Sequence, residues 1–436
     1  MNFPRLVNRF PALFSRWLLL AGVCLLTAVA LIDPADKIFH MKIPAFALIV
    51  LVWLARQGVT KRTVPPRVWI GVIGLGVMVP LLWTVLGLVR YNVHSEDVSF
   101  GVIKSFLFLV IVPVVLSEDI DLASLIMRLG SVVALITFVM VGVSFLAPAV
   151  FDVLYAFSLQ KENAIITESR DLLGLGVGMF YYKTSALLTL PFSHYSSRLT
   201  GVGPGKWRTL ALWACYGIAL VFSGARANFL AALGIAGFFG ARYVARKLGW
   251  VPASVFVLAG ALAITSTLVV KLANPAESSN AIKLKHMQSY EREFVSHPSY
   301  LLLGQGADTT FYSTGFQSWT GSTELSYLDL IRVYGVPMSL LMCGCLAWLA
   351  LKLLKREQYG LAIGFIAYLL ISGSNPLLIS STGFLAICAV WKEVEFPSSE
   401  NSAFHLTDLR TVIPRRLFAS WIVPTRGKVP LSLERN

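Results

Sequence analysis

Two arginines and a glutamate are the residues of this sequence best suited to chemistry. Arg226 follows a tight turn that begins at Ser223, between two apolar runs, and Asn228 comes two residues later. A guanidinium is always charged and binds phosphate oxygens through paired hydrogen bonds. Arg226 therefore predicts a phosphate clamp at a membrane surface. The alternative is an arginine that extends its charge toward lipid headgroups.

The second candidate cation, Arg292, lies in a predicted amphipathic helix over residues 281–295. It either binds the same anion or pairs with the carboxylates that flank it in the sequence. His297 follows, as a helix-end residue or a catalytic base. The Gly304-x-Gly306 turn beyond it lets the backbone approach a ligand closely and offers N–H groups.

Glu324 stands where the chain is expected to re-enter the membrane. In the first turn of a helix a carboxylate suits the helix dipole. Half-desolvated, it can also take a proton from an acceptor hydroxyl, so either Glu324 or His297 is the expected base. Tyr327 follows it, and Lys183, in an earlier apolar run, is expected to line a polar interior.

The sequence lacks the motifs of metal sites, nucleotide-binding loops and disulfide frameworks. Six histidines are scattered without the spacing of a metal site, and there is no Walker loop or dinucleotide fingerprint. We therefore expect no metal and no cofactor. All five cysteines lie in apolar runs, which argues against a disulfide framework.

The elements that position these residues follow from composition. The 436 residues are 56% hydrophobic and 14% charged, whereas soluble proteins carry about 25% charged residues. Long apolar runs with few charges are typical of transmembrane helices. The net charge of +14 arises in short segments between these runs, which is the positive-inside pattern and argues against a nucleic-acid partner.

We predict an all-α, polytopic membrane protein of about twelve transmembrane helices, with eleven as the alternative because several runs are short. The expected spans are 17–32, 43–55, 68–88, 99–116, 126–147, 172–191, 209–223, 225–241, 250–271, 327–351, 359–372 and 376–391. The expected regions are transmembrane helices within 1–271, a large extracytoplasmic loop over 272–326, transmembrane helices within 327–391, and a basic cytoplasmic tail over 392–436. Lysine and arginine in alternate connections place both termini in the cytoplasm, although the inside segment 117–125 carries only carboxylates.

These motifs resemble the O-antigen polymerase/ligase superfamily of bacterial envelope glycosyltransferases. The resemblance covers about residues 200–345 and rests on the Ser223–Arg226 turn, the late outer loop with Arg292 in its helical start, the segment 297–306, and Glu324 followed by Tyr327. It implies an enzyme of the bacterial inner membrane whose donor is an oligosaccharide on undecaprenyl diphosphate. Two arginines would hold the diphosphate while an acceptor hydroxyl attacks the anomeric carbon with inversion. The expected catalytic residues are Glu324, Arg226 and Arg292, and the expected substrate-binding residues are Arg226, Arg292, Asn228, Ser223, His297, Gly304, Gly306, Tyr327 and Lys183.

The leading hypothesis is a polysaccharide polymerase, for O-antigen or exopolysaccharide, that joins repeat units at the outer face of the membrane. A chain-length regulator would be a further partner. Ligases of the superfamily carry a His-Asn-like pair where this chain has Glu324-Leu325, so Glu324 favours the polymerase. A ligase that transfers the glycan to lipid A core or another acceptor is the first alternative. A transporter or flippase of lipid-linked sugars is the second, although it predicts internal repeats that the sequence does not show.

Overall fold

The computed structural model describes residues 10–57, 63–91, 101–162, 169–172, 175–178, 180–200, 206–264 and 278–397. These segments are mainly helical, as the sequence predicts, and their strands form two short antiparallel hairpins. The start of the predicted loop, 272–277, and most of the predicted basic tail, 398–436, lie outside the described residues.

Five helices in the described part of the chain are long and apolar enough to cross a membrane: Phe14–Ile32, Pro66–Val89, Leu122–Leu146, Arg226–Leu248 and Ser326–Lys355. Shorter apolar helices accompany them: Ile103–Ser117, Trp207–Phe222, Trp250–Ala259 and Tyr359–Ser372. Large apolar side chains on the long helices point outward, and Ile70, Leu146 and Leu340 are 73%, 89% and 66% exposed. Such a surface suits lipid and not water. The chain therefore has the character of a membrane protein.

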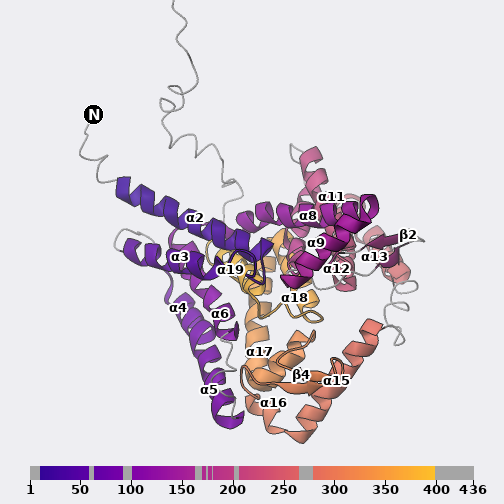
Figure 1. The fold of residues 1–436 in the computed structure, drawn as a ribbon. Helices are drawn as coiled ribbons and strands as arrows, with labels where there is room; N and C mark the ends of the chain where they lie inside the picture. Colours follow the sequence, from indigo (N-terminus) through magenta and orange to yellow (C-terminus); the bar gives the residue numbers. More distant parts are fainter. Residues whose placement is uncertain are drawn as a thin grey trace, which may run out of the picture. The chain divides into compact units, whose positions relative to one another are not determined.

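The first half of the chain is a series of helices interrupted by short irregular turns. Its elements are α2 (Phe10–Ile32), α3 (Lys42–Arg56), α4 (Pro66–Ile73), the π-helical turn η1 (Gly74–Met78), α5 (Val79–Tyr91), α6 (Gly101–Leu107), the 3₁₀ turn η2 (Phe108–Val110), α7 (Ile111–Ser117), α8 (Leu122–Leu146) and α9 (Pro148–Gln160). Helices α2 and α3 pack side by side (Figure 1). The helix predicted over 99–116 is thus α6 and α7 joined by a tighter turn.

One predicted span is wrong. Residues 172–191 do not form a single helix, because strands β1 (Ser169–Leu172) and β2 (Leu175–Gly178) pair as a hairpin. The 3₁₀ turn η3 (Ser185–Leu188) and α10 (Thr189–Leu199) follow. Glycine at 174, 176 and 178 explains the error, since glycine is a poor helix former and this spacing has the period of a strand.

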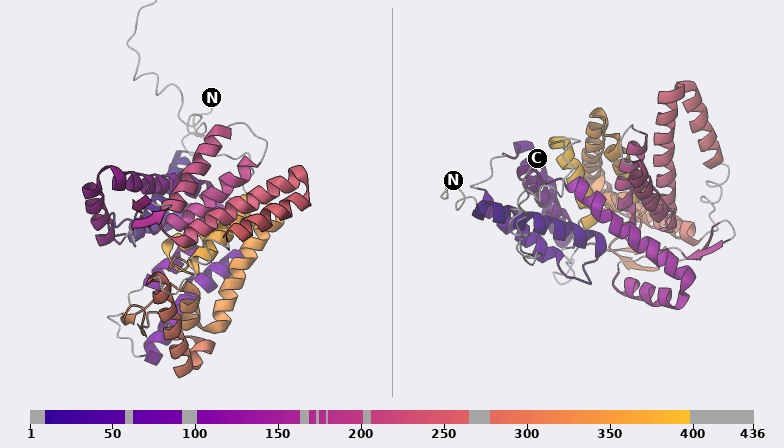
Figure 2. Two further views of the ribbon diagram at one scale, coloured as in Figure 1. Left: turned by 90° about the vertical axis from the view of Figure 1, so that its right-hand side faces the viewer. Right: turned by 90° about the horizontal axis from the view of Figure 1, so that it is seen from above.

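The central helices pack around α10, which contacts α11 (Lys206–Phe222), α12 (Arg226–Leu248) and α18 (Tyr359–Ser372). Helix α12 turns back into α13 (Trp250–Ile264) at Gly249, whose φ of 96° suits glycine. The two helices run beside each other as a hairpin (Figure 2).

The predicted helix over 281–295 is confirmed as α15 (Ser278–Ser296). It is followed by α16 (Ser299–Leu303) and the hairpin of β3 (Phe311–Ser313) and β4 (Ser318–Thr320). These elements gather around the start of α17 (Ser326–Lys355) (Figure 1). Helix α17 is broken at Gly335, where φ is 77° and ψ is 165°. Helix α19 (Ser381–Glu395) ends the described chain.

Two carboxylates of the acidic segment that departs from the positive-inside pattern, Glu118 and Asp119, form ion pairs. Glu118 accepts two hydrogen bonds from Arg56, at 2.7 and 2.9 Å, and both side chains are buried. Lys392, which is 1% exposed, lies 3.8 Å from Asp119 and 3.1 Å from Glu393. The cations that balance these carboxylates come from other helices, so a local count of charges misses them.

Candidate functional site

The turn that carries Arg226 is fixed by its own polar side chains. Gly224, with φ of 74°, reverses the chain between α11 and α12. The amide of Asn228 donates to Ser223 Oγ at 2.9 Å, and Ser223 Oγ donates to Leu220 O at 2.7 Å. Ser223 and Asn228 are fully buried. They shape the turn that holds Arg226 at the start of α12, as a clamp requires, and they do not face solvent.

Helix α15 supplies the partner of Arg226. Arg226 Nη1 lies 3.4 Å from Asn280 Oδ1, in the first turn of α15. One turn later, Lys283 Nζ lies 3.6 Å from Glu324 Oε2, and each of these two side chains is 30% exposed. Residues three apart share one face of a helix. Arg226 and Glu324 therefore both contact this face of α15, and we call Arg226, Asn280, Lys283 and Glu324 the α15 cluster.

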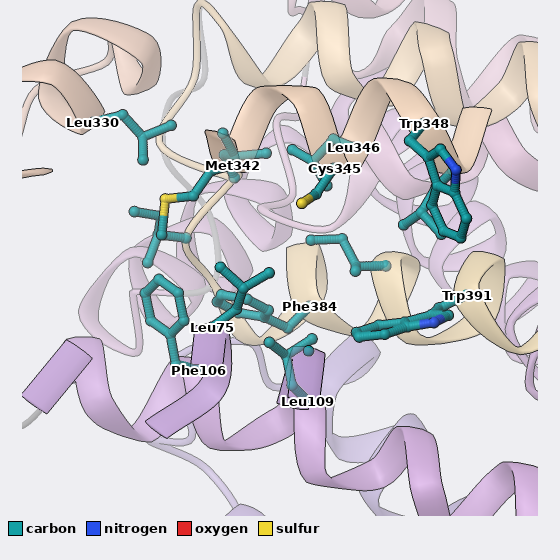
Figure 3. Close-up of a pocket in the computed structure, with 15 residues that line it drawn as sticks. Leu75, Phe106, Leu109, Leu330, Met342, Cys345, Leu346, Trp348, Phe384 and Trp391 are labelled. Carbon is teal, nitrogen blue, oxygen red and sulfur yellow. The ribbon is translucent and has the colours of Figure 1, made fainter. Parts of the chain in front are cut away.

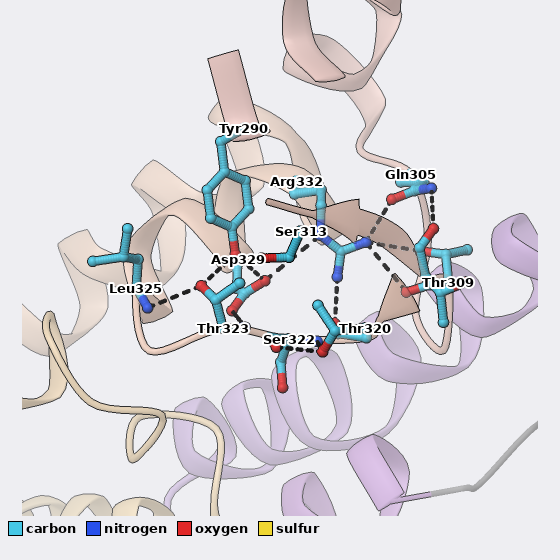
Figure 4. A network of polar contacts seen from close by, with 12 residues as sticks. Tyr290, Gln305, Thr309, Ser313, Thr320, Ser322, Thr323, Leu325, Asp329 and Arg332 are labelled. Carbon is cyan, nitrogen blue, oxygen red and sulfur yellow. Dashed lines mark hydrogen bonds and ion pairs between the residues drawn. The ribbon is translucent and has the colours of Figure 1, made fainter. Parts of the chain in front are cut away.

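Glu324 is held by its two neighbours in the sequence. The Thr323 N–H donates to Asp329 Oδ2 at 2.7 Å, and the Leu325 N–H donates to Thr323 Oγ1 at 3.1 Å. The Tyr290 hydroxyl donates to Asp329 Oδ1 at 2.5 Å and lies 2.8 Å from Thr323 Oγ1 (Figure 4). Burial raises the pKa of Tyr290, and the Asp329 carboxylate adds to this rise, so the phenol keeps the proton it donates.

Arg332 completes this buried network. It is 0% exposed, and its Nε lies 3.6 Å from Asp329 Oδ1. Its Nη1 donates to the side chain of Gln305 and, at 3.2 Å, to both oxygens of Thr309, while Nη2 donates to Gly321 O (Figure 4). Both Nη groups of this buried guanidinium donate to protein oxygens, and its Nε lies at ion-pair distance from Asp329 without a hydrogen bond. Arg332 therefore ties the loop to α17 and is not offered to a ligand.

The Gly304-x-Gly306 turn has a packing role. Its backbone N–H groups donate to protein carbonyls: Gly304 to Tyr300, Gln305 to Arg332, Gly306 to Val333 and Ala307 to Trp83. A Cβ at Gly304 would lie 2.1 Å from Val333 O, and one at Gly306 would lie 2.5 Å from the Gly87 backbone. The turn passes between α5 and the break in α17. It has no N–H left for a substrate, which corrects the binding role predicted for Gly304 and Gly306.

Arg292 lies away from Arg226. It is exposed, and it follows Asn280 by 12 residues on the same helix, a rise of about 18 Å. It also faces away from buried Tyr290, because two residues rotate a helix by about 200°. The structure does not bring the two arginines together. Lys283, one turn from Asn280 on α15, is the other cation of the α15 cluster.

His297 is likewise outside the α15 cluster. Its ring stacks on Tyr300 with centroids 4.8 Å apart, and Nδ1 lies 3.7 Å from Glu293 Oε1 one turn earlier. The side chain is 51% exposed. These contacts are those of a helix-end residue.

Tyr327 and Lys183 make contacts elsewhere. The Tyr327 hydroxyl donates to Leu369 O at 2.8 Å and so joins α17 to α18. Lys183 directly precedes Thr184, whose Oγ1 donates to Leu31 O at 2.9 Å, near the end of α2. There it interacts electrostatically with Glu162. Neither residue belongs to the α15 cluster.

His286 is a residue that the sequence reasoning missed. Its Nδ1 lies 2.7 Å from Ser313 Oγ, and its ring meets Phe316 edge-on with centroids 4.4 Å apart. Burial lowers the pKa of His286, although the Glu324 carboxylate acts to raise it. The regular spacing of Asn280, Lys283 and His286 is a signal that could have revealed this polar face of α15.

The described residues contain no group of three or more His, Cys, Asp or Glu side chains arranged to hold a metal ion. Comparison with family models, curated proteins and solved structures finds no match for this chain. A functional assignment therefore depends on the geometry of the α15 cluster and on the motifs in the sequence.

Proposed function

We propose that this protein is a polysaccharide polymerase that joins lipid-linked repeat units at the outer face of a bacterial inner membrane. The observation that carries the proposal is the α15 cluster, in which α15 contacts Arg226 through Asn280 and Glu324 through Lys283. In glycosyl transfer from a diphosphate donor, cations can stabilise the leaving group and a carboxylate can take the acceptor's proton. The motif order that resembles the O-antigen polymerase/ligase superfamily supports the same reading.

In the proposed reaction an acceptor hydroxyl attacks the anomeric carbon of the donor sugar. The bond from that carbon to the diphosphate oxygen breaks, and undecaprenyl diphosphate leaves with both bonding electrons. Arg226 and Lys283 stabilise the charge that develops on the leaving group. Glu324 takes the proton of the acceptor hydroxyl. Inversion at the anomeric carbon follows from a single displacement.

The ion pair between Lys283 and Glu324 implies that the donor binds before Glu324 acts as the base. Without substrate, Lys283 Nζ lies 3.6 Å from Glu324 Oε2. An incoming diphosphate carries more negative charge than one carboxylate and draws Lys283 toward itself. The Glu324 carboxylate, released from this ion pair, then takes the proton of the acceptor hydroxyl.

We further propose an even number of crossings, with both termini in the cytoplasm and the α15 cluster outside. The contacts at the two ends of α3 and α19 support this topology, because they indicate that both helices cross the same membrane. Their starts are joined by Lys42, whose Nζ lies 2.9 Å from Ser381 Oγ. Their ends lie beside one acidic segment, through Arg56–Glu118 and Lys392–Asp119. The two helices therefore run in the same direction between two distinct faces.

The test is reconstitution of the purified protein in liposomes with an oligosaccharide on undecaprenyl diphosphate, followed by product analysis. The proposal expects polymers of many repeat units. It also expects Glu324→Gln to slow transfer by about 10²–10⁴-fold, the usual cost of losing a general base. Exposed Glu357, in the turn after α17, supplies the matched control Glu357→Gln with unchanged activity.

Other products would contradict the polymerase. A single-unit adduct on a different acceptor would make the protein a ligase. Movement of intact lipid-linked oligosaccharide across the bilayer, with no new glycosidic bond, would make it a transporter.

A further inference from the structure

Two buried tyrosine hydroxyls in the described part of the chain, those of Tyr181 and Tyr334, have no hydrogen-bond partner. The two residues are 6% and 0% exposed. Most buried polar groups are hydrogen-bonded, so each of these hydroxyls calls for an explanation. Tyr334 packs against the rings of Trp83 and Phe106, and the second of these rings lines the apolar cavity beside α17 (Figure 3). Tyr181, in contrast, has polar neighbours that belong to the candidate site.

The backbone around Tyr181 places this residue beside the turn that carries Arg226. The Phe180 N–H donates to Phe222 O at 3.3 Å, directly before that turn. The rings of Phe180 and Tyr182 lie side by side, with centroids 5.9 Å apart, and the Tyr182 hydroxyl donates to a carbonyl at the end of α2. Alternate residues of an extended segment point to opposite sides. Tyr181 therefore faces away from the end of α2.

The Tyr181 side chain also neighbours α18 and Glu324. It interacts electrostatically with Tyr368, near the end of α18, and with the Glu324 carboxylate. The same end of α18 contacts the start of α17, where the Tyr327 hydroxyl donates to Leu369 O at 2.8 Å. Two sets of contacts therefore lead from the turn before α12 to Glu324, one through α15 and the other through Tyr181 and α18.

The Tyr181 hydroxyl is suited to donate a hydrogen bond to a carboxylate. Burial raises the pKa of Tyr181, and Tyr368 and Glu324 add to this rise, so the phenol stays neutral and keeps its proton. The Glu324 carboxylate, in turn, is held loosely. It is 30% exposed, and its ion pair with Lys283, at 3.6 Å, is longer than a hydrogen bond.

We propose that Tyr181 is a positioning residue, whose hydroxyl donates a hydrogen bond to the Glu324 carboxylate once Lys283 has moved to the diphosphate. One carboxylate oxygen then accepts this bond, and the other takes the proton of the acceptor hydroxyl. A catalytic base that a further group orients is a recurring arrangement in enzymes. The inference rests on the proposed function for the reaction and for the role of Glu324.

The direct test is Tyr181→Phe, which removes the hydroxyl alone, assayed for sugar transfer in liposomes. Loss of one hydrogen bond to a charged group should lower kcat by about 10- to 150-fold. The KM for the donor should change little, because the cations of the α15 cluster remain. The melting temperature should not fall, because the hydroxyl has no partner in the described resting fold. Full activity, or a loss accompanied by a lower melting temperature, would overturn the proposal.

Tyr334→Phe is the matched control. It removes the other buried hydroxyl that lacks a partner among the described residues, at a position that packs among aromatic rings and outside the α15 cluster. It should leave transfer unchanged. Equal losses in Tyr334→Phe and Tyr181→Phe would contradict a specific role for Tyr181.

A double-mutant cycle tests whether Tyr181 acts through Glu324. Tyr181→Phe should cost less than about threefold in kcat when it is added to Glu324→Gln, although it costs at least about tenfold in the wild-type protein. Losses that multiply in the double variant would show that Tyr181 acts independently of Glu324 and would overturn the proposal.

A spectroscopic readout distinguishes failure of this proposal from failure of the proposed function. With a fluorinated tyrosine at position 181, addition of geranyl diphosphate should shift the fluorine NMR signal, and Glu324→Gln should abolish the shift. The same shift in both proteins, or none in either, would contradict the contact between Tyr181 and Glu324. If the wild-type protein shows the shift but transfers no sugar, the enzymatic function fails and the contact stands. If it transfers sugar without the shift, this inference alone fails.

Discussion

Removal of one hydroxyl, in Tyr290→Phe, tests how Glu324 is held. The Tyr290 hydroxyl donates to ionisable Asp329 at 2.5 Å, and Asp329 in turn accepts the Thr323 N–H at 2.7 Å. A buried hydrogen bond to a charged group contributes about 1.5–3 kcal/mol. Because 1.4 kcal/mol is a factor of ten in an equilibrium constant, local opening around Glu324 should become about 10- to 150-fold more frequent.

Hydrogen exchange measures that opening directly. The amides of Thr323 and Leu325 flank Glu324, and both donate within the network, so their exchange should accelerate by this factor in Tyr290→Phe. Tyr312→Phe is the matched control, because Tyr312 lies on β3 and is 48% exposed. Exchange that changes less than threefold in Tyr290→Phe, or equally in both variants, would refute the reasoning.

The same variant has an enzymatic consequence that a purely structural role would not produce. A displacement of about 1 Å at a catalytic group can cost up to about 100-fold in rate. Tyr290→Phe should therefore lower kcat while the KM for the lipid-linked donor changes little, since the cations of the α15 cluster are untouched. A raised KM with unchanged kcat would show that the network serves binding instead.

The remaining predictions concern packing, protonation and charge. Gly304→Ala should lower the free energy of unfolding, measured by denaturant titration, by more than about 2 kcal/mol. Gly304 has φ of 79°, and a Cβ there would lie 2.1 Å from Val333 O. Gly344→Ala is the control and should change stability little, because a Cβ at Gly344 meets nothing within 4 Å. Burial holds the pKa of His286 below its ordinary 6.5, so the folded state disfavours the charged imidazole. The stability of the loop around residues 313–316 should therefore be full above pH 6.5 and fall as the pH drops below that value. The facing groups are Lys283 and Glu324, and hydrogen exchange over residues 313–316 should show no such pH dependence in His286→Asn. Lys283→Met should raise the KM for the lipid-linked donor about tenfold or more, the loss of one charge-assisted contact, and an unchanged KM would remove Lys283 from the site.

Most of the helices were predictable from the sequence because a run of apolar residues needs no knowledge of its neighbours. The error at 172–191 has a local cause, since three alternating glycines favour a hairpin over a helix. Pairing between distant elements was the harder part. The cations that neutralise Glu118 and Asp119 come from α3 and α19, and no local pattern announces them.

The candidate site was predicted in part. The turn at Arg226 and the position of Glu324 could be inferred from residue type and from their place between apolar runs. The choice of Arg292 over Lys283 could not be settled by motif, because it depends on which face of α15 meets α12. The polar face of α15 is marked by the spacing of Asn280, Lys283 and His286. Arg292 was predicted instead because arginine is the residue type that binds phosphate best.

The central claim is that Arg226 and Lys283, and not Arg292, bind the diphosphate. The most direct measurement is the rate of sugar transfer in liposomes by Arg226→Lys and Arg292→Lys, compared at saturating donor. We expect Arg226→Lys to lose about 10²–10³-fold in kcat, the usual cost of removing a group that stabilises a developing anion, and Arg292→Lys to keep nearly full activity. Equal losses in the two variants, or a larger loss for Arg292→Lys, would contradict the account.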